Sequence, residues 1–436
     1  MYNIFTKFFN KEINLLKNPD VMTAFCELLS IPSVKGKPEA DAPFGADVKR
    51  ALTYTLNLAE SFGFKTNNYD NYVGEVVFGE GKPFGVLCHL DVVPVGNLSS
   101  WNTPPFTPTE IDGNLYARGA LDDKCGAIAT LYALKRLKDE GITPTREIRL
   151  ILGCDEESGW GCIEHYKKCA TLPEEGISPD ADFPVIYAEK GIVHAKFTLK
   201  KLKPFDLSGG TVANVVCDHC KFKLNADYSD ALAEKLGIQV LGEGEYENFG
   251  VSAHGSTPDK GVNALKPVFH MLSALGYLDA SAYKNFFLDA QSLTKLNDET
   301  GFLTFSPDVA QTDDENLYLT VDIRYPATYA FESIAAQLSK LAPYETLHRQ
   351  LPLYADKNGK LVRALLNVYN QVTGDNAEPI AIGGGTYARA LKSAVAFGPS
   401  FGEEGYSIHQ PNEYIPIENF YKLIEILYRA LKTLCC

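Results

Sequence analysis

The stretch VLCHLDVVPVG, residues 86–96, decides the fold. Its apolar start is typical of a buried strand, and the strand stops at His89 and Asp91 before Pro94 and Gly96. Side chains two positions apart on a strand point to the same face, so this imidazole and this carboxylate emerge together. A carboxylate that holds the second ring nitrogen of a His commonly supports a metal ligand. A buried His that is satisfied by a neighbouring Asp is the alternative interpretation.

Strands and helices alternate on either side of this stretch. The segments GEVVFG (74–79) and REIRLILGCDEE (146–157) indicate strands, and AIATLYALKRLKDEG (127–141) has apolar residues at helical spacing. Such alternation predicts an α/β domain with a mostly parallel sheet and helices on both faces. Ligands gather beyond the carboxyl ends of the strands in these sheets, which is where His89, Asp91 and the acids 155–157 fall.

The pattern changes near residue 191. GIVHAKFTLKKL (191–202) alternates, a helix and further strands follow, and LYLTVDIRYP (317–326) is another strand. The order strand-helix-strand-strand-helix-strand predicts an inserted α+β domain of ferredoxin-like type. We therefore assign residues 1–190 and 352–436 to the first domain and residues 191–351 to the insertion.

Composition limits the classes of partner. The 436 residues carry 41 Lys and Arg against 55 Asp and Glu, a net charge of −14, which argues against nucleic acid and anionic membranes. Residues 1–20 indicate an amphipathic helix rather than a signal peptide, and no apolar stretch approaches the length of a membrane span. Cys217 and Cys220 form a lone C-x-x-C, whose role the sequence leaves open. We expect a cytoplasmic protein.

Acidic residues recur where strands and helices of the first domain meet. They stand in RGALDDKCGAI (118–128), LGCDEESGWG (152–161) and SPDADFPVIYAEKG (178–191), and GYSIHQPNEYI (405–415) predicts a late strand ending on His409. Each segment also has a simpler interpretation, such as a helix cap or a solvated acidic loop. Together they indicate His, Asp and Glu ligands for two divalent ions at one edge of the sheet.

The combination of eight motifs resembles a known family. HLDVVPVG, GALDDK, DEESGWG, SPDADFP, GVSAHGS, VDIRYP, GGGTYAR and IHQPNEY run from residue 89 to residue 414. This set is similar to the zinc exopeptidases of the aminoacylase, carnosinase and carboxypeptidase G type, and within them to the PepV-like bacterial dipeptidases.

The resemblance implies two Zn²⁺ ions per chain, with Co²⁺ or Mn²⁺ as alternatives, bridged by Asp122 and a water or hydroxide. One ion would be completed by His89 and Asp180, with Asp182 as the fallback, and the other by Glu157 and His409. It also implies a cis peptide bond between Asp122 and Asp123.

Catalytic roles follow from the same resemblance. Glu156 corresponds to the general base and Asp91 to the residue that holds the free nitrogen of His89. The inserted domain corresponds to a lid, from which His254 polarises the scissile carbonyl.

Substrate contacts are implied for residues that share a polar or glycine-rich setting: Asn214, Arg324, Gly384 and Arg389. Arg suits a free terminal carboxylate because it can offer two parallel hydrogen bonds. Arg389 in a surface salt bridge is the alternative interpretation of that side chain.

We therefore expect a zinc-dependent dipeptidase that hydrolyses small unblocked peptides, as a monomer or homodimer. The alternatives are an amidohydrolase of N-acyl amino acids and a catalytically silent binding protein of the same fold. A nucleotide-binding protein that uses GGGTYAR is a further alternative, although this segment lacks the Gly-Lys-Ser/Thr ending of a phosphate loop.

Overall fold

The computed structural model describes residues 19–225, 229–288 and 290–436. These residues form two compact units. The first contains the described part of Met1–Tyr187 together with Ala355–Ile380 and Thr386–Cys436, and the second contains Ala188–Tyr354 and Ala381–Gly385. The amphipathic helix expected over residues 1–20 lies outside the described residues up to residue 18.

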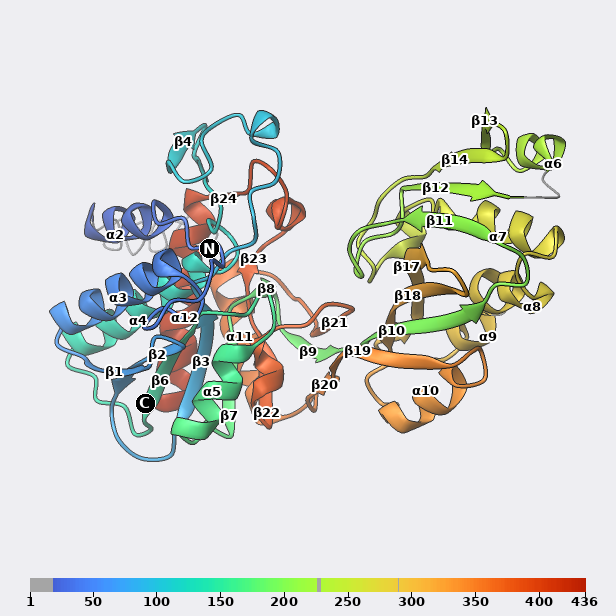
Figure 1. Ribbon diagram of the computed structural model, residues 1–436. Helices are drawn as coiled ribbons and strands as arrows, with labels where there is room; N and C mark the ends of the chain where they lie inside the picture. The colour runs from blue at the N-terminus through green and yellow to red at the C-terminus, as the bar shows by residue number, and fades with distance from the viewer. Residues whose placement is uncertain (1–18, 226–228, 289) are drawn as a thin grey trace. The chain divides into compact units, whose positions relative to one another are not determined.

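A mixed sheet forms the centre of the first unit (Figure 1). Six of its strands follow the order β1 (Lys65–Tyr69), β2 (Val73–Phe78), β6 (Ile148–Gly153), β3 (Phe84–His89), β7 (Glu175–Ser178) and β22 (Ser393–Ala396), and the sheet continues from β22 into β9 (Ile186–Glu189). The four strands β6, β3, β7 and β22 run parallel, as predicted. Strands β1 and β2 are antiparallel to each other, because a short turn can only join antiparallel strands, and β2 is also antiparallel to β6.

Helices cover both faces of this sheet. Gly74 and Glu75 are successive residues of β2, so they point to opposite faces. A Cβ on Gly74 would meet Leu52 of α3, whereas Glu75 accepts a hydrogen bond from Tyr166 of α5. The helices of this unit are α2 (Pro19–Leu29), α3 (Ala46–Ser61), α4 (Lys124–Asp139), α5 (Gly161–Cys169), α11 (Lys360–Thr373) and α12 (Ile417–Cys435).

Short elements surround the edge of the sheet where β3 ends. Strands β4 (Thr109–Ile111), β5 (Asn114–Tyr116) and β24 (Tyr414–Pro416) form a small sheet, and β8 (Ala181–Asp182) pairs with β23 (Pro399–Ser400). The 3₁₀ turns of this unit are η1 (Leu98–Ser100), η4 (Tyr387–Ala390) and η5 (Glu403–Ser407). The prediction of a late strand that ends on His409 is wrong, because η5 and a left-handed His409 (φ 63°) precede β24.

The second unit contains an eight-stranded antiparallel sheet. Its order is β13 (Gln239–Gly242), β14 (Glu245–Phe249), β12 (His219–Leu224), β11 (Phe205–Gly209), β17 (Thr304–Thr312), β18 (Asn316–Tyr325), β10 (Gly191–Lys200) and β19 (Tyr344–Gln350). Burial alternates along β11 and β12, as expected when one face meets a core and the other meets solvent.

Helices supply the core on the buried face of that sheet (Figure 1). The α-helices are α6 (Asp230–Lys235), α7 (Leu265–Ala274), α8 (Ala280–Tyr283), α9 (Ala290–Thr294) and α10 (Phe331–Leu338). The unit also contains the helical turns η2 (Pro258–Lys260) and η3 (Lys284–Leu288) and a hairpin of β15 (Asn297–Asp298) and β16 (Gly301–Phe302). Residues of α7 such as Leu265, Phe269 and Leu272 are fully buried in this core. The unit is therefore the inserted α+β domain that the sequence predicts.

The chain passes between the units through β9 (Ile186–Glu189), β20 (Leu353–Tyr354) and β21 (Ile380–Ile382), which pair through β9. We assigned all of 352–436 to the first domain, yet Ala381–Gly385 groups with the second unit. The reason is that Lys190 N–H donates to Ile382 O and Arg324 donates to Gly383 O.

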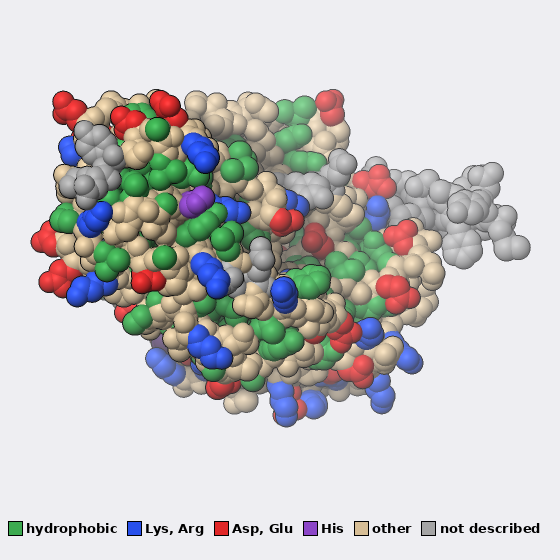
Figure 2. Space-filling view, turned by 90° about the vertical axis from the view of Figure 1, so that its right-hand side faces the viewer, with side chains coloured by type: hydrophobic (Ala, Val, Ile, Leu, Met, Phe, Trp, Pro, Cys, Tyr) green, Lys and Arg blue, Asp and Glu red, His purple; other side chains and the backbone are tan. Residues whose placement is uncertain are grey.

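None of the described helices is long and apolar enough to cross a membrane. On the face drawn in Figure 2, acidic and basic side chains are interspersed among hydrophobic ones.

Candidate metal centre and catalytic site

The predicted polar residues of the first unit converge where its central strands end. Strands β6, β3 and β7 are parallel neighbours, so their carboxyl ends meet at one edge of the sheet. His89 is the last residue of β3, Asp180 lies two residues after β7, and Glu156 and Glu157 follow β6. Asp122 lies just before α4. This edge is the position where open α/β sheets bind ligands.

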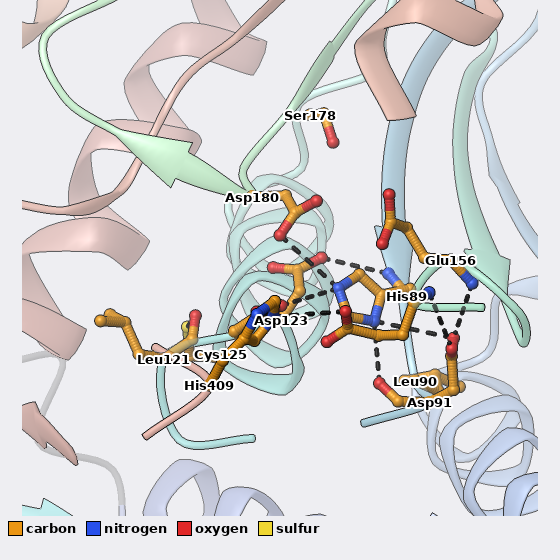
Figure 3. Close-up of polar contacts among 12 residues, drawn as sticks. His89, Leu90, Asp91, Leu121, Asp123, Cys125, Glu156, Ser178, Asp180 and His409 are labelled. Carbon is orange, nitrogen blue, oxygen red and sulfur yellow. Dashed lines mark hydrogen bonds and ion pairs between the residues drawn. The ribbon is translucent and has the colours of Figure 1, made fainter. Parts of the chain in front are cut away.

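His89 is buried among carboxylates (Figure 3). Its Nε2 lies 2.8 Å from Asp122 Oδ1 and 3.5 Å from Asp180 Oδ1. Burial lowers the pKa of this imidazole, but the Asp180 and Asp122 carboxylates outweigh burial and raise it well above its ordinary value. One carboxylate oxygen of Asp122 and one of Asp180 therefore face the Nε2 atom of His89.

Asp122 connects His89 with the second predicted histidine. While its Oδ1 faces His89, its Oδ2 lies 2.9 Å from His409 Nε2, which is also 3.2 Å from Glu157 Oε2. Burial opposes the charged form of His409, yet Asp122 and Glu157 raise its pKa to about 11. The Asp122 carboxylate thus has one oxygen in each of two His-carboxylate groups, the arrangement expected of a bridging ligand.

Asp91 supports the site through its backbone and its side chain. His89 Nδ1–H donates to the backbone carbonyl of Asp91 at 2.8 Å, whereas the Asp91 carboxylate lies 3.7 Å away. That carboxylate instead accepts the backbone N–H groups of Glu156 and Glu157, both at 3.1 Å. In the neutral ring with Nδ1 protonated, Nε2 carries the lone pair toward Asp122 and Asp180. The tautomer is the one that a metal-binding His requires.

Glu156 lies beside the cluster and outside its His contacts. The indole of Trp160 donates to Glu156 Oε1 at 3.1 Å. Burial raises the pKa of Glu156 well above its ordinary value, and the nearby Asp180 raises it further. A carboxyl group with a raised pKa is suited to accept and release a proton.

The structure distinguishes the two aspartates of SPDADFP. Asp180 faces His89, and burial raises its pKa to about 7 against the opposing effect of that imidazole. Asp182 is exposed in β8 and its side chain contacts Ser400. Of this pair, only Asp180 reaches the cluster.

Sequence reasoning missed two acids that shape the site. Glu413 is buried, and its Oε1 accepts the backbone N–H groups of Leu121 (2.9 Å) and Asp122 (3.1 Å) while its Oε2 pairs with Arg118 Nη1 (2.7 Å). Asp123 accepts the backbone N–H of His89 at 3.1 Å, and the expected cis peptide bond precedes it. The acid in NEY, four residues after His409, was the available signal for Glu413.

The remaining predicted residues belong mostly to the second unit. His254 is exposed, and its Nδ1 accepts the backbone N–H of Ser256 at 3.2 Å, so the neutral ring carries its proton on Nε2. The backbone carbonyl of Asn214 accepts from Gly255 N–H at 2.7 Å, beside His254. These contacts fix the loop that carries the predicted carbonyl-polarising His.

Arg324 is buried and engaged by its own strand. Its Nε and Nη2 both donate to the Asp322 carboxylate at 2.8 Å, and its Nη1 donates to Gly383 O at 3.3 Å. Gly384 groups with this unit, whereas Arg389 of η4 groups with the first. The fork of Arg324 that we expected to hold a substrate carboxylate is therefore used by Asp322.

Comparison with known proteins agrees with this geometry. The model of "Peptidase family M20/M25/M40" matches residues 85–433. A Bacillus subtilis (strain 168) protein named "Putative dipeptidase YtjP" is 34% identical over 467 aligned residues, with 98% of this chain and 99% of that protein covered. A "Putative dipeptidase" of Staphylococcus epidermidis is 34% identical and covers 94% of this chain and 95% of its own.

Two solved structures share the fold. The M20 family metallo-carboxypeptidase Sso-CP2 of Sulfolobus solfataricus matches with a TM-score of 0.61 at 20% identity, covering 95% of this chain and 98% of that one. The dipeptidase Dug1p of Saccharomyces cerevisiae matches with a TM-score of 0.62 at 15% identity, covering 98% of each.

Proposed function

The chain belongs to peptidase family M20/M25/M40, and we propose that it is a metal-dependent dipeptidase acting on small unblocked peptides. The membership confirms the resemblance read from the motifs. The observation that carries the proposal is the cluster at the β6–β3–β7 edge, in which Asp122 contacts both His89 and His409 with Glu156 alongside. Relatives named as dipeptidases over nearly the whole chain support the same activity.

The donor set fits a divalent metal centre. Imidazole nitrogens and carboxylate oxygens are ligands that zinc accepts, and a buried group of carboxylates is costly without compensating positive charge. We propose two Zn²⁺ ions, one held by His89 and Asp180 and one by Glu157 and His409, with Asp122 shared. Such ions polarise a carbonyl and lower the pKa of water toward about 7 when bound.

Glu156 would carry the proton in hydrolysis. Its carboxylate accepts a proton from the attacking water and later delivers it to the leaving amine, which restores the carboxylate. Trp160 orients this side chain through the indole N–H, and Asp91 holds the backbone of Glu156.

We propose that residues of the second unit bind the substrate. The Nε2–H of His254 can donate to the carbonyl oxygen that becomes negative in the transition state. The Asp322 carboxylate holds the guanidinium of Arg324 in place. The Nη1 side of this guanidinium, which Asp322 does not occupy, is therefore the part suited to bind a substrate carboxylate. Asn214 and Gly384 of the same unit complete these proposed contacts, and Arg389 of the first unit is proposed as a further substrate contact.

The thiols support a proposal for the compartment. All ten cysteines are free, which is typical of a reducing compartment. We therefore propose that the enzyme acts in the cytoplasm.

Metal analysis of the purified protein combined with a substrate panel tests the proposal. We expect at least two divalent ions per chain and rapid hydrolysis of dipeptides with free termini. C-terminally amidated dipeptides and N-acetyl amino acids serve as matched controls and should be poor substrates. Preference for N-acetyl amino acids would instead favour the amidohydrolase, and metal-loaded protein without hydrolysis of any of these would favour a binding protein.

A further inference from the structure

Three metal-ligand side chains meet on the first unit at a place that the proposed chemistry does not use. His165 Nε2 lies 2.9 Å from Asp70 Oδ2 and 3.4 Å from Cys169 Sγ. The three atoms lie within 4.8 Å of one another. His165 and Cys169 belong to α5, and Asp70 belongs to the turn between β1 and β2.

A single hydrogen bond at Nε2 accounts for only one of these two contacts. Nε2 carries at most one proton, so it cannot donate to both Asp70 and Cys169. If Nε2 is unprotonated, its lone pair faces the carboxylate directly. A cation at the centre of the three atoms would satisfy all of them at once.

The framework holds the three atoms in place. Asp70 (φ 53°) and Asn71 (φ 60°) are both left-handed, and Tyr72 N–H donates to Tyr69 O, which together make a type I′ hairpin turn. Tyr72 stacks on the His165 ring with centroids 4.1 Å apart and planes 13° apart. The turn therefore supplies Asp70 and the ring that orients His165.

Helix α5 contributes the spacing between two of the ligands and a helix dipole that favours a cation. His165 and Cys169 are four residues apart, so they lie on one face of the helix, as in other paired ligands on helices. Cys169 is the last residue of α5, and the carboxyl end of a helix favours a cation.

From this convergence we propose a second metal site, formed by Asp70, His165 and Cys169, that takes a zinc-class divalent ion. Carboxylate, imidazole and thiolate donors suit Zn²⁺, and a thiolate with a carboxylate balances its charge. Ligand atoms around tetrahedral zinc lie about 3.3–3.6 Å apart; the Nε2–Sγ separation of 3.4 Å lies in this range, and the Nε2–Oδ2 separation of 2.9 Å is shorter. The Asp70 side chain is 76% exposed and that of His165 23%, so an ion can enter and a water can take the fourth position.

The site would tie the β1–β2 turn to helix α5. That helix begins at Gly161, directly after the segment that carries Glu156 and Glu157. An ion at its far end would therefore anchor the element that follows the catalytic acids, without contact with them.

Cobalt spectroscopy distinguishes this site from the catalytic cluster. The proposed catalytic ligands are nitrogen and oxygen atoms, so only a thiolate-bound Co²⁺ gives the near-ultraviolet thiolate-to-metal charge-transfer band. We expect this band when full-length, chelator-stripped protein is titrated with Co²⁺. It should be lost in Cys169→Ser and in His165→Gln, and retained in Cys436→Ser, which changes the other exposed cysteine.

A second measurement uses zinc alone. Zn²⁺ should block alkylation of Cys169 by iodoacetamide while Cys436 of the same molecules still reacts. Dipeptide hydrolysis should be unchanged in His165→Gln, because this residue is outside the proposed machinery. No charge-transfer band at saturating Co²⁺, or a band that persists in Cys169→Ser, would overturn the proposal whatever the catalytic activity proves to be.

Discussion

Glu413→Gln should weaken metal binding although Glu413 is not a proposed ligand. In the structure, its carboxylate holds the backbone N–H groups of Leu121 and Asp122 and pairs with the buried Arg118. A glutamine is nearly isosteric, but its amide can accept on one side only. Either Arg118 or the Leu121–Asp122 backbone then faces an N–H₂ group, and Asp122 loses its fixed position.

The substitution should lower both the stability of the fold and the affinity for metal. Removing one partner of a buried ion pair costs about 3–5 kcal/mol of stability. Loss of a residue that orients a metal ligand typically lowers metal affinity by about 10–100-fold, which is about 1.4–2.7 kcal/mol of binding free energy.

Glu425→Gln is the matched control. Glu425 of α12 is also buried in the first unit, and it pairs with Arg136 of α4 and with Arg429 of its own helix. Neither partner is a proposed metal ligand, so this variant should lose stability but keep its metal affinity. Competition for Zn²⁺ with a chromogenic chelator, on protein checked for folding by circular dichroism, measures the difference. Equal metal affinity in the two variants would refute the positioning role of Glu413.

Four further outcomes are expected. Glu156→Ala should abolish turnover while metal content stays at the wild-type level; loss of metal would identify Glu156 as a ligand instead. His254→Ala should lower kcat by about 10²–10³ with a smaller effect on KM, and near-normal kcat would exclude oxyanion stabilisation. Arg324→Ala should raise KM for dipeptides with a free carboxylate and much less for amidated ones; equal effects on both would remove the carboxylate contact. Asp308 is buried beside Ser306, and burial raises its pKa to about 8. The folded state therefore keeps a proton that the unfolded state has lost, so this group destabilises the fold by up to about 1.4 kcal/mol per pH unit as pH rises from about 4 to 8. Asp308→Asn should raise the thermal unfolding temperature several times more at pH 8 than at pH 5, and a pH-independent difference would contradict this.

Much of the site could be predicted because short sequence patterns determine the strands and helices that carry its residues. The apolar run before His89 predicts a strand, the alternation of strands and helices predicts parallel neighbours, and parallel strands place their carboxyl ends together. These rules bring His89, Asp180 and Glu157 to one edge without knowledge of any tertiary contact. The residue types then indicate a divalent ion, because few other partners suit imidazole with clustered carboxylates.

The sequence by itself therefore determined which elements form, which edge carries the site and which chemistry its residues offer. The tertiary structure alone decided which atoms meet: Asp180 rather than Asp182 at His89, the backbone carbonyl of Asp91 at the ring, His409 on a turn, and Glu413 behind Asp122. The physical reason is the range of the interactions. Periodicity and turn chemistry act over a few residues, whereas the hydrogen bond from Asp122 to Glu413 joins positions 291 residues apart, and the packing of the whole unit sets that distance.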